Sequence, residues 1–143
     1  MISLKTFFKI PQLRLIAGLL FIAVLFNACE DDIVSSGDLR DEYIGQWTCH
    51  ESSEQYGDSD YFVSVSKGMD EDHILISNFY NLGESESVSV YIQDNSLTIL
   101  NQTVKGNDIQ GSGNSSISFS TINFTYTVND GAELDHATAE YTR

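Results

Sequence analysis

The feature that most constrains this chain is a repeated alternation of apolar and polar residues that begins near residue 44. Val88, Val90 and Ile92 alternate with Ser87 and Ser89, and similar stretches occur before and after them. A period of two places every second side chain on the same face of a β-strand. No apolar run in this region has the 3.6-residue period of a helix over a useful length. The alternation therefore predicts antiparallel strands with one buried face.

Turn signals rich in glycine, asparagine and aspartate divide the alternating region into eight segments. Eight strands joined by short turns in sequence order fit an up-and-down meander that can close into a barrel, so the expected fold class is all-β. Apolar residues of the seventh segment switch from odd to even positions, which predicts a bulge or turn near Ser120 and Thr121. The predicted strands lie near residues 44–51, 60–67, 73–80, 86–93, 96–103, 107–113, 116–128 and 134–142.

A different pattern precedes the strands. Lys5, Lys9 and Arg14 are followed by residues 15–26, which carry no polar side chain. This run is shorter than the roughly 20 apolar residues that a membrane-spanning helix needs, and it is typical of the core of a signal peptide. We therefore expect residues 1–28 to be a signal segment that is cleaved.

The residues around the expected cleavage point resemble the lipobox of bacterial lipoproteins. Ala28 is a small residue directly before Cys29, and residues 25–29 follow the apolar run. The resemblance implies that Cys29 is lipidated and becomes the mature N-terminus, with acyl chains that anchor the protein stably to a membrane. The alternative is an ordinary secretory signal, which would leave Cys29 and Cys49 free to form a disulfide.

Glu30, Asp31 and Asp32 follow Cys29 directly and are similar to the acidic export signal of Bacteroidota lipoproteins. That resemblance implies an outer-membrane protein that faces the cell exterior, with the periplasmic face as the alternative. A solvated acidic tether is the simpler interpretation of the same cluster. We expect residues 29–42 to form a flexible acidic tether, with one possible helical turn near its end at residues 38–43, and residues 43–143 to form the domain.

Charge excludes one class of partner. All twenty-one carboxylates follow Ala28, whereas three of the seven basic residues precede it, so residues 29–143 carry a net charge of −17. Such a surface cannot neutralise a phosphate backbone, and no nucleic-acid partner is expected. The acidic turns at residues 58–60 and 70–72 offer oxygen ligands for calcium, but neither matches a calcium-loop pattern. We interpret them as solvated loops and expect no metal site.

Gly45, Gln46 and Trp47 are similar to the Gly-x-Trp motif of lipocalins, whose tryptophan closes one end of an eight-stranded barrel beneath a basic side chain. The resemblance implies that Arg143 covers the Trp47 ring in a cation–π contact. A longer resemblance, over residues 44–143, is to small lipocalin-like (calycin-like) surface lipoproteins of Bacteroidota, a largely uncharacterised group. It implies architecture and anchoring, without a substrate.

No catalytic motif emerges. His50 and Glu51 lack the second histidine of a zinc-protease helix, and residues 111–113 lack the context of a nucleophile elbow, so we interpret that Gly-Ser-Gly as a flexible strand end or bulge. Three histidines are scattered along the chain, at positions where surface roles are more common than metal binding. Cys49 shares a strand face with Trp47 and is expected to be a small buried side chain. We expect no enzyme and no cofactor.

The sequence therefore favours a monomeric, non-enzymatic binding module, anchored to a membrane by its N-terminal lipid, for an unknown small molecule, glycan or protein. The alternative is a structural or accessory envelope protein, or a protease inhibitor, that acts through protein contact. A barrel filled by Val63, Leu75, Val90 and Phe124, without a cavity of some 300 Å³, would exclude a ligand inside the barrel and leave the rim and the outer face.

Overall fold

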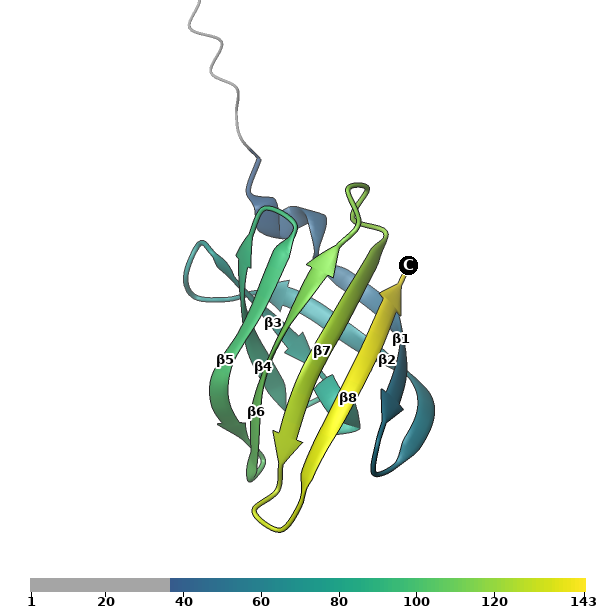
Figure 1. Ribbon diagram of the computed structural model, residues 1–143. Helices are drawn as coiled ribbons and strands as arrows, with labels where there is room; N and C mark the ends of the chain where they lie inside the picture. The colour runs from purple at the N-terminus through teal and green to yellow at the C-terminus, as the bar shows by residue number, and fades with distance from the viewer. Residues whose placement is uncertain (1–36) are drawn as a thin grey trace, which may run out of the picture. The chain divides into compact units, whose positions relative to one another are not determined.

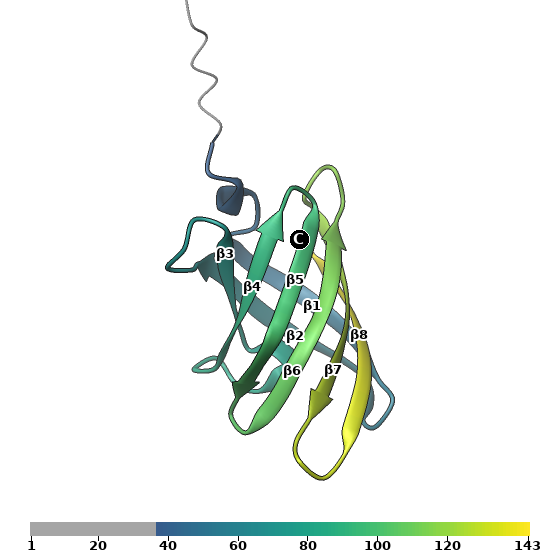
Figure 2. The same cartoon turned by 60° about the vertical axis from the view of Figure 1, so that its left-hand side comes forward.

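The computed structural model describes residues 37–143, which form one closed antiparallel barrel (Figure 1). Its strands pair in sequence order, and the last pairs with the first, which confirms the predicted eight-stranded up-and-down fold. A second view shows β1 and β2 crossing the barrel behind β5 and β6 (Figure 2). The short 3₁₀ helix η2, Leu39–Glu42, precedes β1, and η3, Phe79–Asn81, connects β3 to β4. The strands are β1 Gly45–Ser53, β2 Gly57–Lys67, β3 His73–Ser77, β4 Ser87–Gln93, β5 Ser96–Val104, β6 Asn107–Ser115, β7 Thr121–Asn129 and β8 Leu134–Thr142.

Strand β1 shows how the alternation becomes a wall of the barrel. Trp47, Cys49 and Glu51 point inward and are buried, whereas the residues between them are exposed. The strand is paired on both sides, with β2 along its whole length and with β8 from Thr48 to Ser53. The expectation that Cys49 shares the buried face of Trp47 is confirmed.

The predicted core is right except at one position. Val63, Val90 and Phe124 are buried inside the barrel, but Leu75 is half-buried on the outer side of β3. Its neighbours Ile74 and Ile76 point inward instead. Three consecutive apolar residues carry no alternation, so the sequence does not specify which parity faces the core; the register of β3 with β2 and β4 decides it.

The interpretation of Gly111 and Gly113 as a strand end or bulge was wrong. Both lie inside the continuous strand β6, opposite Tyr126 and Phe124 of β7. A Cβ atom at either glycine would come within 2.5 Å of the facing aromatic side chain. The glycines are required because β7 lies so close to the β6 backbone: the Phe124 ring lies over Gly113, and Cα and Cβ of Tyr126 lie over Gly111.

A bulge does occur, in β5, where the sequence did not predict one. The register with β6 shifts between Ile99 and Gln102. Ser89 of β4 lies beyond the residues of β4 that pair with β5, and the Gln102 side chain supplies its hydrogen bonds instead. Its Nε2 donates to the Ser89 carbonyl at 2.7 Å, and its Oε1 accepts from the Ser89 N–H at 2.8 Å. An amide side chain thus keeps a buried strand edge hydrogen-bonded.

Strand β7 begins at Thr121, five residues later than predicted. Residues 116–120 form the turn from β6, in which the Ser116 hydroxyl accepts the N–H groups of Ser120 and Thr121. Phe119 has a φ of +51° there and packs edge-on against Tyr43, with ring centroids 5.3 Å apart. The parity change expected near Ser120 is therefore a turn.

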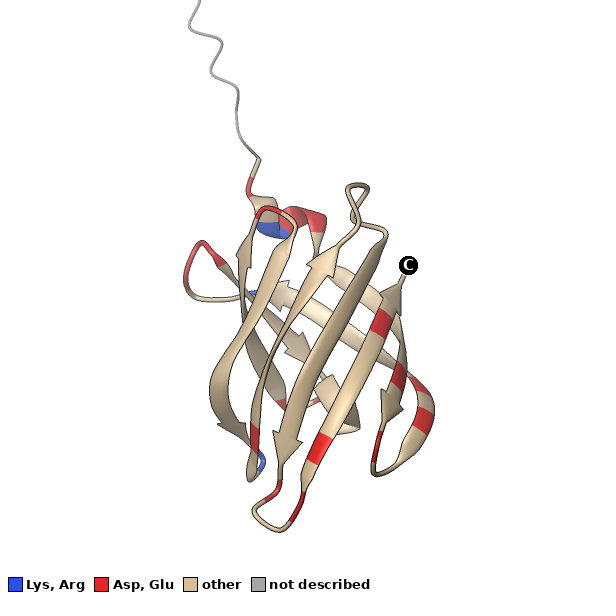
Figure 3. Cartoon of the chain, in the orientation of Figure 1, with Lys and Arg blue, Asp and Glu red and all other residues tan. Residues whose placement is uncertain are grey.

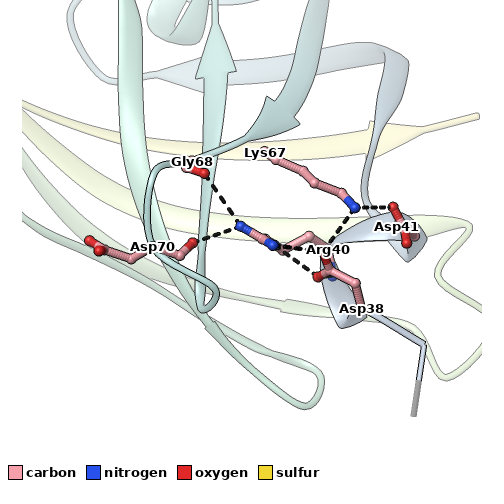
Figure 4. A network of polar contacts seen from close by, with 6 residues as sticks. All are labelled: Asp38, Arg40, Asp41, Lys67, Gly68 and Asp70. Atoms are coloured by element: carbon pink, nitrogen blue, oxygen red, sulfur yellow. Dashed lines mark hydrogen bonds and ion pairs between the residues drawn. The ribbon is translucent and has the colours of Figure 1, made fainter. Parts of the chain in front are cut away.

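The end of the predicted tether belongs to the folded unit. Residues 39–42 form η2, in agreement with the helical turn expected there, and a polar network holds this helix to the β2–β3 turn (Figure 4). Arg40 pairs with Asp38 at 2.7 Å and donates to the Asp70 carbonyl at 2.8 Å, while Lys67 contacts Asp38 and Asp41. Arg40, together with Lys67, holds the pKa of Asp38 well below its usual range.

Candidate functional site

One end of the barrel is closed around Trp47. Its indole N–H donates to the Tyr43 carbonyl at 2.8 Å, and the Arg143 guanidinium carbon lies 4.4 Å from the ring centroid. Arg143 also donates to the carbonyls of Glu42 at 2.6 Å and Ile44 at 3.4 Å. The tryptophan and the arginine that the lipocalin resemblance paired are thus in contact, in a geometry that supports a cation–π interaction. The contact joins β1 to the residue that follows β8.

Aromatic side chains occupy the interior. Phe79, on η3, reaches into the barrel and lies 4.6 Å from Tyr126 and 6.0 Å from Phe124, measured between ring centroids. Phe124 in turn lies 5.2 Å from Tyr141. All four side chains are buried. The space that a lipocalin-like ligand would need is filled by the protein's own side chains.

A polar cluster lies within this core. The hydroxyls of Tyr61 and Tyr126 donate to the same oxygen of Glu51, which is only 4% exposed. Burial raises the pKa of Glu51, so its carboxyl is held closer to the neutral form. Among the described residues, the buried Tyr141 hydroxyl has no hydrogen-bond partner. Burial also raises the pKa of Cys49 to about 12, which leaves the thiol protonated and unsuited to act as a nucleophile.

Sequence reasoning missed this cluster, although a signal for it was present. Glu51 has the same odd parity as Trp47 and Cys49, which already placed it on the inward face of β1. Its partner Tyr126 lies 75 residues away, so the pairing itself depends on barrel closure.

The opposite end carries a second buried carboxylate. Asp135 of β8 accepts the hydroxyls of Ser53 at 2.5 Å and Tyr80 at 2.6 Å, and the Gln55 N–H at 3.1 Å. The cavity beside it measures about 30 Å³, which is room for roughly two water molecules. Asp135 therefore ties η3 and the β1–β2 turn to β8, and the cavity is too small for a ligand of ordinary size.

The larger concave surface lies outside the barrel. Two adjoining depressions of about 530 and 350 Å³ run along β8, between β1 and β7, and share Ser52, Thr125 and Thr138. We call them together the outer groove. Its outward side chains are hydroxyl, imidazole, amide and carboxylate groups: His50, Ser52, Glu54, Asn123, Thr125, His136, Thr138 and Glu140.

The inner side of β8 explains why a hollow can form there. Its inward residues at this level are Ala137 and Ala139, both buried. Because alanine side chains are small, β8 can lie close to the core at this level, which leaves room on its outer side. On the outer side, Ser52 and Thr125 are the neighbours of Thr138 in the two flanking strands. The floor of the groove is therefore a row of short hydroxyl side chains.

Histidines line both parts of the outer groove. The Nδ1–H of His50 donates a 2.8 Å hydrogen bond to Asp60 of β2, which raises the pKa of the imidazole, and His50 lies opposite Glu140 in the β1–β8 register. His136 lies at the other part of the groove, and His73 lies apart from both, at the start of β3. Within residues 37–143 no group of three or more histidine, cysteine or acidic side chains is placed to hold a metal ion.

Acidic residues lie in turns and along the strands (Figure 3), and those of the described part are at least partly exposed, except for the buried Glu51 and Asp135. Asp58 and Asp60 are exposed on β2, and residues 70–72 form the β2–β3 turn. Among the basic residues of the described part, Arg40 and Lys67 are engaged in ion pairs with aspartates. The visible surface is thus strongly acidic, which favours basic or uncharged ligands.

The lipidation residue Cys29 and the export residues Glu30, Asp31 and Asp32 lie outside the described residues, as does the signal segment. In residues 37–143, no helix combines the length and the apolar character needed to cross a membrane.

Comparison with known proteins supports the fold. No protein-family model matches the chain, and no curated protein matches it. A redesigned β-barrel of known structure is similar, with 13% sequence identity and a TM-score of 0.51, over 73% of this chain and 93% of the other. At this identity the likeness concerns the fold alone, and the resemblance to Bacteroidota lipoproteins stays a prediction.

Proposed function

We propose that this protein is a lipid-anchored surface lipoprotein whose barrel binds a polar ligand, of the glycan class, in the outer groove. The observation that carries the proposal is the contrast between a filled interior and a hollow outer face. The volumes of its two parts fall within the range of about 300 to 1,000 Å³ that is usual for ligand sites. The barrel acts as a rigid scaffold, without chemistry of its own.

The lining favours a hydroxyl-rich ligand. Ser52, Thr125 and Thr138 both donate and accept hydrogen bonds, as do Asn123 and the neutral form of His136. The outward side chains of the groove include no aliphatic or aromatic residue, and Phe124, Ala137 and Ala139 contribute to its lining from inward-facing positions. A polar chain that lies along β8 could replace its hydrogen bonds to water by hydrogen bonds to several of these side chains at once.

Filling the groove tests this proposal. Thr138→Trp places a large side chain where the two depressions meet, whereas Thr48→Trp makes the same exchange at an exposed position of β1 outside the groove. Fluorescently labelled protein comprising residues 30–143 is applied to an oligosaccharide array. We expect the wild type and Thr48→Trp to bind the same glycans and Thr138→Trp to lose them. Equal binding by all three, or none by the wild type, would contradict a glycan site in the groove.

The membrane anchor is tested separately. Cys29→Ala should abolish incorporation of labelled fatty acid and release the protein from the membrane fraction, whereas Cys49→Ala should retain the label. Protease added to intact cells should digest the wild type if the barrel faces the exterior, provided that a known surface protein is cleaved in parallel. Labelling that persists in Cys29→Ala would refute the lipoprotein assignment, and protection until lysis would favour the periplasmic face.

A second candidate function is contact with another envelope protein, as a structural component or an inhibitor. The acidic surface of the barrel, with exposed Tyr56 and Phe62, favours it. Crosslinking in intact cells would distinguish it from glycan binding, because a stoichiometric protein partner would be recovered.

A further inference from the structure

The barrel is closed, but its hydrogen-bond ladder is incomplete beside β2. Strand β2 has eleven residues and β3 has five. β1 pairs with β2 from Val65 back to Gly57, whereas β3 pairs only with Ser64–Lys67. Residues 57–63 therefore have a neighbouring strand on one side only.

The direction of the free backbone groups follows from one contact. The Phe62 carbonyl accepts a 2.8 Å hydrogen bond from the Asn78 side chain, just beyond the end of β3, so Phe62 directs its backbone groups away from β1. Successive residues of an antiparallel strand alternate in this direction, so Asp58 and Asp60 do the same. Within residues 37–143, the Asn78 contact is the one hydrogen bond recorded to this set of backbone groups. We call the backbone of Asp58, Asp60 and Phe62 the β2 edge.

Side chains along the β2 edge are exposed and chemically distinctive. Asp58 and Asp60 are exposed on β2, and Phe62 is 61% exposed. Tyr56, in the preceding turn, is 75% exposed. An open strand edge is a template on which another strand can pair. Proteins usually prevent such pairing with charged side chains on the edge, or by covering it with a helix or loop. On the β2 edge, this protection consists of the carboxylates of Asp58 and Asp60, which repel an acidic strand and attract a basic one.

We propose that the β2 edge is a docking site for an extended, basic segment of a partner protein, which adds to the barrel as a strand. Such a segment would donate to and accept from the free groups of Asp58, Asp60 and Phe62. Basic side chains at alternate positions of the segment lie beside the two aspartates, and an apolar side chain lies beside Phe62.

Charge decides between the possible occupants. A second copy of this chain would bring the same two aspartates against Asp58 and Asp60, and like charges on adjacent strands are destabilising. The chain's own segment at residues 30–32 is also entirely acidic. A basic segment from another protein is the occupant whose charge complements the edge. This site touches the outer groove at one contact, the 2.8 Å hydrogen bond between His50 and Asp60. The backbone of the β2 edge lies apart from β7 and β8, so either proposal can fail without the other.

The test uses a short synthetic peptide that carries one valine and two lysines in succession on one face, separated by threonines, to match Phe62, Asp60 and Asp58. A peptide with glutamate in place of each lysine is the charge-reversed control. Binding to the mature soluble protein is followed by backbone amide NMR and by amide hydrogen exchange. In the free protein, the amides of Asp58, Asp60 and Phe62 should exchange much faster than those of Tyr61 and Val63, which face β1. The basic peptide should shift and protect the three edge amides, and the acidic peptide should not.

Variants separate backbone docking from charge. Asp60→Pro removes an N–H that has no ladder partner, so the barrel should fold, and it should weaken peptide binding by at least about tenfold. Asp60→Asn keeps the N–H and should weaken binding less. Glu71→Gln, which removes an exposed carboxylate in the β2–β3 turn, should bind as the wild type does.

Three results would overturn the proposal. The first is slow exchange of the edge amides in the free wild-type protein, which needs no variant. The second is equal binding of the acidic and basic peptides, or binding that shifts amides elsewhere on the barrel. The third is concentration-dependent dimerisation that protects the same amides, which would assign the edge to a second copy of the chain.

Discussion

Glu51 shows how a single residue links the fold to pH. Its carboxyl lies inside the barrel, where the hydroxyls of Tyr61 and Tyr126 donate to it. Burial penalises the charged form, and these two hydrogen bonds offset only part of that penalty, so the pKa of Glu51 is raised in the folded state. The unfolded chain binds fewer protons than the folded protein between the two pKa values. The contribution of Glu51 to stability is therefore fully present below the unfolded pKa and decreases as pH rises through the folded pKa.

Glu51→Gln should remove this dependence. We expect the free energy of unfolding of the wild type, relative to Glu51→Gln, to fall as pH rises above the ordinary carboxyl pKa of 4.5, by up to about 1.4 kcal/mol per pH unit within the titration range. Urea denaturation at several pH values measures the difference. Glu84→Gln, which removes an exposed carboxylate from the connection between β3 and β4, is the control for loss of a carboxylate outside the barrel. A constant difference between the wild type and Glu51→Gln at all pH values would disprove the assignment.

At the scale of the strand, β6 and β7 show why the wall of the barrel needs glycine. Gly113 allows the Phe124 ring to lie against the β6 backbone, and Gly111 makes room for Cα and Cβ of Tyr126. The rings of Phe124 and Tyr126 also contact Phe79 of η3. The close approach of β6 and β7 therefore helps to position the aromatic side chains that fill the barrel. Glycine, although unfavourable in a strand, is here a packing requirement.

Gly111→Ala should therefore be destabilising by about 1 to 3 kcal/mol, because its Cβ would come within 2.5 Å of Tyr126 and of the Thr125 carbonyl oxygen. Ser112→Ala, at the exposed position next to it, should change the free energy of unfolding by less than about 0.5 kcal/mol. Urea denaturation measures both. If Gly111→Ala matched Ser112→Ala, the two strands would have to lie further apart than described.

At the scale of the whole molecule, the two ends of the described chain meet at Arg143. Its guanidinium covers Trp47 and donates to the carbonyls of Glu42 and Ile44, about one hundred residues earlier in the sequence. This contact joins the last strand to the segment that enters the barrel. It complements the β1–β8 ladder, which closes the barrel through the backbone.

Arg143→Ala should lower the free energy of unfolding by about 1 to 2 kcal/mol, through loss of the cation–π contact and of two hydrogen bonds. Arg143→Lys should retain part of this stability, because an ammonium can still lie over the ring but lacks the planar fork. Trp47 is the protein's only tryptophan, so its fluorescence reports directly on this end of the barrel. Unchanged emission and stability in Arg143→Ala would show that the contact does not contribute.

Several features were predictable from the sequence because they depend on local periodicity. Alternation and turn residues identified eight strands in meander order and the inward parity of Trp47 and Cys49. Strand starts were less accurate where apolar residues belong to turns, as Ile117 and Phe119 do before β7. Of the candidate sites, the Trp47–Arg143 pair was suggested by resemblance, whereas the outer groove and the β2 edge were not predicted.

By itself, then, the sequence determined the secondary structure and which face of most strands is buried, since each side chain's hydrophobicity acts on its own strand. Only the tertiary structure decided which parity of β3 faces inward, which tyrosines meet Glu51, and where the wall is hollow or unpaired. These depend on strand register and length, as in the difference between β2 and β3. Register is fixed by contacts between residues far apart in sequence, and no local pattern contains that information.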